Sequence, residues 1–167
     1  MGSRCFPALS YLLASVLLAG LSQAADMLLI DDFMAEDGLS RLGTPWRLVT
    51  DRVMGGVSVG QMARKQTEGQ HALCLQGEVS LENNGGFVQA ALDLAPEGYL
   101  DAQRYTGIRL VVRGNGESYG LHLKSADIRL PWQSYRSAFP TGPDWQEIRL
   151  PFREFLPHRI DTPLDTT

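Results

Sequence analysis

The amino-acid sequence predicts an all-β protein, an antiparallel β-sandwich or jelly roll. Apolar and polar residues alternate with a period of two over several short stretches. These stretches follow one another at intervals of roughly 8–15 residues, a spacing typical of sandwiches. Gly, Asn and Pro fall between them, and no long stretch carries the 3.6-residue apolar stripe of an amphipathic helix.

The alternation places the expected strands in order along the chain. They cover residues 27–33, 46–50, 58–66, 72–79, 87–94, 108–113, 119–124, 133–139 and 145–150. The triplet Gly114-Asn115-Gly116 predicts a hairpin between two of these strands, because Gly and Asn adopt positive φ at little cost. Residues 96–104 and 152–156 are each expected to form a turn of helix.

Composition excludes several classes of protein. The chain has 167 residues, of which 44% are hydrophobic and 20% charged, and its net charge is −4. These values exclude collagen-like, coiled-coil, disulfide-rich and wholly disordered chains. No block of Lys and Arg is present, so neither DNA nor RNA is an expected partner. No repeat or linker divides the chain, which predicts one domain.

The N-terminal segment 1–24 has the pattern of a signal peptide. Arg4 precedes an apolar run over residues 9–21 (LSYLLASVLLAGL), and small residues surround Ala24. The run is shorter than the roughly 20 residues that span a bilayer. We therefore expect a secreted or periplasmic domain of residues 25–167 without a stable membrane span. A retained anchor remains the alternative. Cys74 is then the only cysteine left, so no intrachain disulfide is expected.

One short motif is typical of hydrolases. Residues 56–60 (GVSVG) match G-x-S-x-G, which in hydrolases places a nucleophilic Ser on a strand-to-helix turn. The surrounding chain lacks the alternation of strands and helices that builds such a site. We interpret Gly56 and Gly60 as the ends of a turn and a strand start, and we expect no enzyme activity.

Metal and cofactor signals are weak. His71, His122 and His158 are isolated and lack ligand spacing. The acidic pairs at 31–32 and 36–37 are more often solvated loops than ligands, so no metal site is assigned and a structural Ca²⁺ stays open. No phosphate-binding loop is present, and no cofactor is expected.

Two polar, glycine-rich segments are more unusual. They are residues 51–58 (DRVMGGVS) and 80–87 (SLENNGGF). Paired glycines permit unusual backbone conformations and allow another chain to approach closely. The segments are either tight loops between strands or a binding surface. Trp132 is a candidate exposed aromatic, whereas Trp46 and Trp145 are expected in the core.

These segments together resemble the complex I intermediate-associated protein 30 (CIA30) family. The matching landmarks are Trp46 with 51–58, residues 77–87 (GEVSLENNGGF), 105–110 (YTGIRL), 113–116 (RGNG), and Trp145 with 150–152 and Phe155. The resemblance extends from about residue 31 to residue 157 and implies a galactose-binding-like jelly roll. The founding members of this family are mitochondrial chaperones that hold an intermediate of NADH:ubiquinone oxidoreductase during assembly.

The resemblance also bears on the C-terminal end. Family members usually continue past the position of Thr167 through closing strands. The resemblance therefore implies a domain truncated at its C-terminus, with a sheet edge or inner surface left uncovered. We expect reduced stability or self-association as a result, since an open edge recruits other strands.

The resemblance implies a non-catalytic protein-binding module, like a complex I assembly factor or chaperone. Its client would be a protein, such as an envelope or respiratory complex subunit. The expected contact residues are Asp51, Met54, Gly55, Gly56, Ser58, Glu82, Asn83, Asn84, Gly85, Gly86, Phe87 and Trp132. Backbone groups of the paired glycines would bond the client backbone, and residues 82–84 would supply side-chain hydrogen bonds. The alternative is an envelope domain that binds carbohydrate or a small ligand, with Trp132 or Tyr135 stacking on a sugar.

Overall fold

A computed structural model describes residues 26–167, so the predicted signal segment lies outside the described residues. The fold is all-β, and every strand pair is antiparallel, as the sequence predicted. The strands are β1 (Arg47–Thr50), β2 (Val59–Thr67), β3 (Gln70–Glu78), β4 (Val88–Ala91), β5 (Gly107–Val112), β6 (Ser118–Leu123), β7 (Ser134–Pro140), β8 (Gln146–Pro151) and β9 (Leu156–His158). Short 3₁₀ helices are η1 (Asp51–Met54), η2 (Glu82–Asn84) and η3 (Phe152–Glu154).

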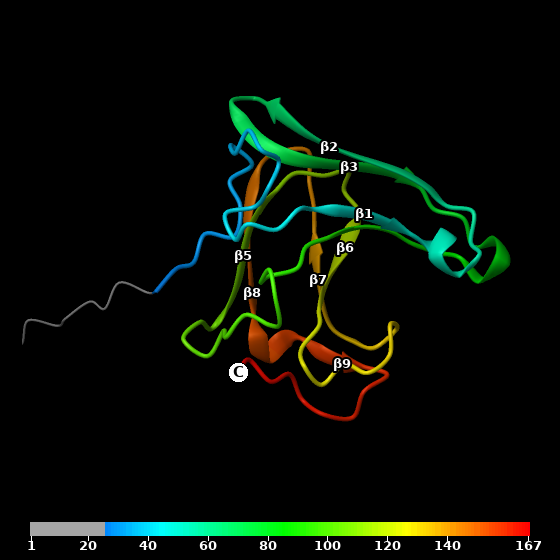
Figure 1. The fold of residues 1–167 in the computed structure, drawn as a ribbon. Coiled ribbons are helices and arrows are strands. Elements are labelled where there is room, and N and C mark those ends of the chain that lie inside the picture. The colour runs from blue at the N-terminus through cyan, green and yellow to red at the C-terminus, as the bar shows by residue number, and fades with distance from the viewer. Residues whose placement is uncertain (1–25) are drawn as a thin grey trace, which may run out of the picture.

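The strands pair in two nested sets (Figure 1). The β2–β3 hairpin lies between the partners β1 and β4 along the chain, and the β6–β7 pair lies between the partners β5 and β8. Strand β9 adds to the free side of β7. As a result, the connection between β1 and β2 lies close to the connection between β3 and β4.

The main core forms between β5–β8 and β6–β7–β9. Its buried members are Tyr135, Phe139, Leu150 and Phe155. The inward residues of β5 and β6 pack against them, following the period of two that the sequence showed. Trp46 and Trp145, which were expected in the core, are only half buried.

Two glycines bring β4 against the β2–β3 hairpin. A Cβ at Gly60 would lie 2.5 Å from a methyl group of Val88, and one at Gly77 would lie 3.1 Å from the same side chain. These two glycines face each other across the hairpin. Their lack of a side chain therefore seats Val88 on the hairpin and fixes the approach of β4.

Residues 27–33 do not form the expected strand. Asp31 accepts a hydrogen bond from the amide of Phe33 at 2.8 Å, and Asp32 accepts one from the amide of Met34 at 3.2 Å. Such local bonds bend the chain, and Phe33 has a φ of 59°. The apolar run was therefore misleading, because the two aspartates that follow it end the extended conformation. Residues 96–104 likewise form no helix.

The hairpin expected at residues 114–116 is also absent. Strand β5 pairs with β8 and β6 pairs with β7, so this turn joins strands of different sheets. The amide of Gly114 donates to the carbonyl of Gly142 at 2.8 Å, and the Gly114 backbone lies directly against Thr141. The glycine is therefore used for close packing of two crossing connections rather than for a tight hairpin.

Candidate functional site

Asp51 joins the two glycine-rich segments from the interior. Its side chain is completely buried. The carboxylate accepts hydrogen bonds from the amide of Ser58 at 3.0 Å and from the Ser58 hydroxyl, within the first segment. It also accepts bonds from the amides of Gly86 at 2.7 Å and Phe87 at 3.4 Å, within the second segment. One carboxylate therefore fixes both loops relative to each other.

Ser58 and the main chain complete this link. The amide of Ser80 donates to the Ser58 hydroxyl oxygen at 2.9 Å, so the second segment is also bound where it begins. The amide of Asp51 donates to the carbonyl of Phe87 at 3.2 Å. The two loops therefore form one hydrogen-bonded unit at the ends of β1 and β3.

The paired glycines allow this arrangement. A Cβ at Gly56 would overlap the Asp51 side chain. A Cβ at Gly85 would lie 2.5 Å from Asp51 Oδ2 and 2.8 Å from the carbonyl oxygen of Ser80. Both glycines are therefore needed for close packing around a buried carboxylate, which the sequence alone did not indicate.

Positive φ angles shape the outer parts of the loops. Gly55 has a φ of 93° and ends η1, while Asn83 and Asn84 have φ angles of 54° and 59°. Asn adopts this left-handed region more readily than most residues with a side chain. These residues turn the chain sharply and leave the amide side chains of both asparagines on the surface.

The hydrogen bonds keep Asp51 ionised. Burial opposes its negative charge, but the hydrogen bonds from the Ser58 hydroxyl and the amides of Gly86, Ser58 and Phe87 together outweigh burial. The pKa of Asp51 therefore lies below its ordinary value. A buried anion that receives this many donors is typical of a rigid structural link.

The linked loops carry an exposed apolar surface. Val53 is 74% exposed, Met54 60% and Leu81 81%. Val57, Val59 and Val79 are exposed on the adjoining strand ends, where Val59 lies opposite Glu78. Figure 1 shows η1, in cyan, and η2, in green, side by side at one extremity of the molecule. We call the six residues Val53, Met54, Val57, Val59, Val79 and Leu81 the apolar tip.

The structure separates the expected contact residues into two groups. Met54, Glu82, Asn83 and Asn84 are exposed, and the side chains of residues 82–84 make no hydrogen bond within the described part of the chain. Asp51, Gly56 and Ser58 are buried, and Gly85 and Phe87 are half buried. The buried group therefore positions the tip and does not itself face a partner.

The paired glycines cannot bond a client in the expected way. The amides of Gly55 and Gly85 donate to the carbonyls of Arg52 and Glu82, and that of Gly56 donates to the carbonyl of Asp51. The amide of Gly86 donates to the Asp51 carboxylate. All four donors are therefore used inside the loops, so the expected pairing of these glycines with a client backbone could use only their carbonyl oxygens.

The aromatic candidates lie elsewhere. Trp132 is 53% exposed on the connection between β6 and β7. Figure 1 places this connection, in yellow, at the β9 end, away from η1 and η2. Tyr135 is completely buried, and its hydroxyl lies 3.3 Å from the Thr162 hydroxyl. The expectation that Tyr135 stacks on a sugar was therefore wrong.

Ser58 does not have the surroundings of a nucleophile. It is buried at the start of β2, and its hydroxyl bonds Asp51 instead of a His. It lies before a strand and not on a strand-to-helix turn. The match to G-x-S-x-G therefore reflects the packing of the loop.

The N-terminal carboxylates are occupied by protein groups. Asp31 accepts from the indole nitrogen of Trp46 at 2.9 Å and from the Arg64 guanidinium at 3.1 Å. Asp32 pairs with Arg41 at 2.8 Å. Over residues 26–167, no group of three or more acidic, His or Cys side chains is placed to hold a metal ion.

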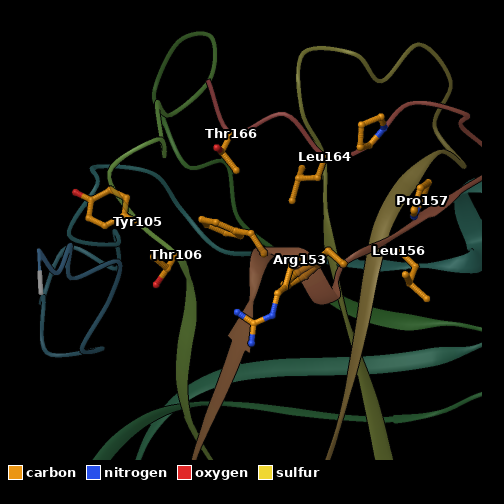
Figure 2. Close-up of a pocket in the computed structure, with 10 residues that line it drawn as sticks. Tyr105, Thr106, Arg153, Leu156, Pro157, Leu164 and Thr166 are labelled. Atoms are coloured by element: carbon orange, nitrogen blue, oxygen red, sulfur yellow. The ribbon is translucent and has the colours of Figure 1, made fainter.

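A separate pocket of about 560 Å³ opens near the C-terminal segment (Figure 2). Its lining is Tyr105, Thr106, Phe152, Arg153, Phe155, Leu156, Pro157, Pro163, Leu164 and Thr166. Figure 2 shows Leu164 and Thr166 facing η3, while the Arg153 guanidinium points away from them. The pocket is mainly apolar and lies at the opposite end from the apolar tip. Sequence reasoning did not find it, because its parts are far apart along the chain.

Sequence reasoning also missed Val53 and Leu81. The weak signal for them was the presence of apolar residues inside loops that are otherwise rich in Gly, Asn and charge. Such residues are usually assigned to the core. Here the buried Asp51 occupies the interior, and the apolar side chains point to solvent.

Comparison with known proteins gives one match. The family model described as Complex I intermediate-associated protein 30 (CIA30) matches residues 32–166, which is most of the chain. No curated protein matches. No solved structure matches either.

Proposed function

The chain belongs to the complex I intermediate-associated protein 30 family, and from this premise we propose that it is a non-catalytic, protein-binding chaperone module. It acts like an assembly factor for NADH:ubiquinone oxidoreductase. The observation that carries the proposal is the apolar tip on loops fixed by Asp51. Several exposed apolar side chains on neighbouring loops of a small domain support an interaction site there.

The chemistry of the tip defines the client. Val53, Met54 and Leu81 form a protruding apolar centre, and Glu82, Asn83 and Asn84 provide hydrogen-bonding groups beside it. Protein interfaces have this arrangement of an apolar centre and a polar rim. The client is a protein that exposes a complementary apolar surface before it is assembled. We propose a subunit of an envelope or respiratory complex, since the sequence predicts export.

The rigidity of the loops supports binding without a catalytic step. Loops that are already ordered lose little conformational freedom when a partner binds, so more of the contact energy appears as affinity. Asp51 supplies this order from inside, and Met54 adapts to an irregular client surface because its side chain is flexible. The tip covers an apolar client surface until another subunit replaces it.

Capture from an extract tests the proposal. The full chain is immobilised beside the variant Val53→Ser/Met54→Ser/Leu81→Ser, and the proteins retained from the native envelope are identified. We expect the variant to retain at least tenfold less of the specific client than the unmodified chain, because a few buried anchors dominate an interface. All three side chains are exposed, so the variant is expected to fold.

Val111→Ser is the matched control, because Val111 is an exposed apolar residue on β5, outside the tip. It is expected to retain the client fully. Equal capture by all three proteins would contradict the assignment of the tip. Equal loss with Val111→Ser would indicate non-specific apolar adhesion.

The pocket favours one alternative. An apolar cavity of about 560 Å³ has the size of a small-ligand site, which supports a ligand-binding domain. Its lining offers few hydrogen-bonding groups for a sugar, and Trp132 is not part of it. Capture that depends on Leu164 or Phe152, and not on the tip, would favour this alternative.

A further inference from the structure

The solvent-facing side of the β6–β7–β9 sheet carries cationic residues in register. His122 on β6 lies opposite Arg136 on β7, and on the other side Arg136 lies opposite the exposed Leu156 of β9, while Ser134 lies opposite His158. Residues that face each other across antiparallel strands point to the same side of the sheet, with their Cβ atoms roughly 5 Å apart. Arg159 follows His158 directly. We call His122, Arg136, His158 and Arg159 the cationic cluster.

Small residues leave room next to the Arg136 side chain. Gly120 and Ala138 form the next cross-strand pair, and both are exposed. A Cβ at Gly120 would come within 3.1 Å of His122 Nε2, so the glycine allows this imidazole to lie along the strand. The His122 imidazole therefore lies over Gly120, beside Arg136, and the small side chain of Ala138 follows Arg136 on the same face of β7.

Arg136 has no acidic partner. Its Nε atom donates to the Ser134 hydroxyl at 2.9 Å, which holds the guanidinium along β7. Across the described residues, the ion pairs use other arginines: Arg41, Arg47, Arg64, Arg104, Arg109, Arg113 and Arg149. The terminal nitrogens of Arg136 donate to no group within residues 26–167. A guanidinium with free N–H donors has the geometry to bind a carboxylate, phosphate or sulfate.

The last member of the cluster is held in a strained conformation. Arg159 has a φ of 57°, in the left-handed region. The main-chain carbonyl of Arg159 accepts a hydrogen bond from Nε2 of the Gln133 side chain at 3.0 Å. The Oε1 atom of the same side chain accepts hydrogen bonds from the main-chain amides of Arg129 and Leu130. These bonds fix Arg159 beside His158. Backbone strain kept in this way is concentrated at functional sites.

We propose that the cationic cluster is a binding site for an oxyanion group, that is a sulfate, phosphate or carboxylate. The guanidinium of Arg136 provides the central donor, and His122 and His158 donate from two sides when they are protonated. The site lies on a different sheet face from the apolar tip and does not depend on the proposed protein-binding function. It gives the domain a second, charge-selective contact.

The charges around the histidines make the site sensitive to pH. Burial, and then Arg136, His158 and Lys124, lower the pKa of His122 from its ordinary 6.5. Burial, Arg136 and Arg159 lower the pKa of His158. Asp127 is the carboxylate of the adjoining β6–β7 connection, and it is not among the groups that shift either imidazole. A bound anion favours the charged imidazoles, so it raises both pKa values, and affinity increases as the pH falls through these raised values.

Sulfate is the appropriate first probe, because its charge is constant over this range of pH. We expect sulfate titrated into the full chain at low chloride to raise the pKa values of His122 and His158, measured from their imidazole proton resonances. His71 on β3 is the internal control and is expected not to respond. Acetate titrated in parallel distinguishes a site for tetrahedral anions from one for carboxylates.

Substitutions in the cationic cluster test whether these side chains bind the anion. Arg136→Gln is expected to weaken sulfate binding at least tenfold, whereas Arg149→Gln, which removes another surface arginine, is expected to leave it unchanged. His122→Asn keeps the test valid if Arg136→Gln fails to fold, and it is expected to reduce the pH dependence. The proposal is overturned if neither anion shifts His122 and His158, if His71 shifts equally, or if binding is the same in folded Arg136→Gln.

Discussion

Asp51 determines the geometry of the candidate site at the scale of a single residue. Its carboxylate receives donors from both glycine-rich segments, and Gly56 and Gly85 lack side chains where it lies. One glycine of each pair, Gly56 and Gly85, is thereby explained by one buried anion, although the pairs are 30 residues apart in the sequence. Asn83 and Asn84 then turn the second loop outward.

Removing the charge of Asp51 is expected to destabilise the domain. In Asp51→Asn an NH2 group replaces one of the two carboxylate oxygens. This group cannot accept the hydrogen bonds that the oxygen received, so a buried donor is left unpaired. We expect a melting temperature several degrees lower. Asp144→Asn, at an exposed carboxylate between β7 and β8, is the matched control and is expected to melt like the unmodified chain.

The pH dependence of stability shows whether the ionised carboxylate of Asp51 stabilises the folded state. The pKa of Asp51 is lowered by folding, so its contribution to the free energy of unfolding is complete above the ordinary value of 3.8 and is lost as the pH falls through the lower, folded value. The difference in stability between the unmodified chain and Asp51→Asn is therefore expected to shrink below pH 3.8. Urea unfolding at several pH values measures it. A difference that grows on acidification would mean that burial dominates and raises the pKa.

At the scale of elements, the loops depend on close packing more than on unusual dihedral angles. Gly85 has a φ of −71°, which any residue adopts, so only its neighbours exclude a side chain. Gly85→Ala is expected to cost about 1–3 kcal/mol, as overpacking of a well-packed site usually does. Gly142→Ala, where a Cβ meets nothing within 4 Å, is expected to change stability by less than about 0.5 kcal/mol. Equal urea midpoints for the two variants would contradict the claim that close packing excludes a side chain at Gly85, where η2 ends.

The sequence predicted the strands well where one face of the strand is buried and the other is exposed to solvent. The alternation located β1 to β8 to within a few residues, because each strand shows its own period. It failed where partners decide the structure. Strand β9 contains a Pro and only three residues, and it exists because β7 offers a free edge. The turn at 114–116 has hairpin chemistry, yet its strands find other partners.

The sequence singled out the loops of the candidate site but did not show which of their residues are buried and which are exposed. The sequence identified both glycine-rich segments, since paired glycines are conspicuous. It could not show that Asp51 and Ser58 lie inside and that Val53 and Leu81 lie outside, because burial in a loop follows from contacts between distant segments. The cationic cluster was missed for the same reason, since strand pairing alone places His122 opposite Arg136 and His158 opposite Ser134, two residues from Arg136 on the same strand.

At the scale of the whole molecule, the apolar tip lies apart from the pocket and the cationic cluster, which adjoin each other at β9. The apolar tip lies at the ends of β1 and β3, while the pocket lies beside β9 and the C-terminal segment (Figure 1). The cationic cluster occupies the outer face of β6–β7–β9. In this arrangement the proposed protein-binding tip leaves the charged face free for the proposed anion.

Site-specific photo-crosslinking tests the central claim, that the apolar tip touches a protein client. A benzophenone amino acid replaces Leu81 in one full-length chain and Val111 in another, and both are irradiated in the native envelope. We predict a discrete adduct with one or two proteins from position 81 and none from position 111. No adduct from position 81, or the same adducts from both positions, would contradict the account.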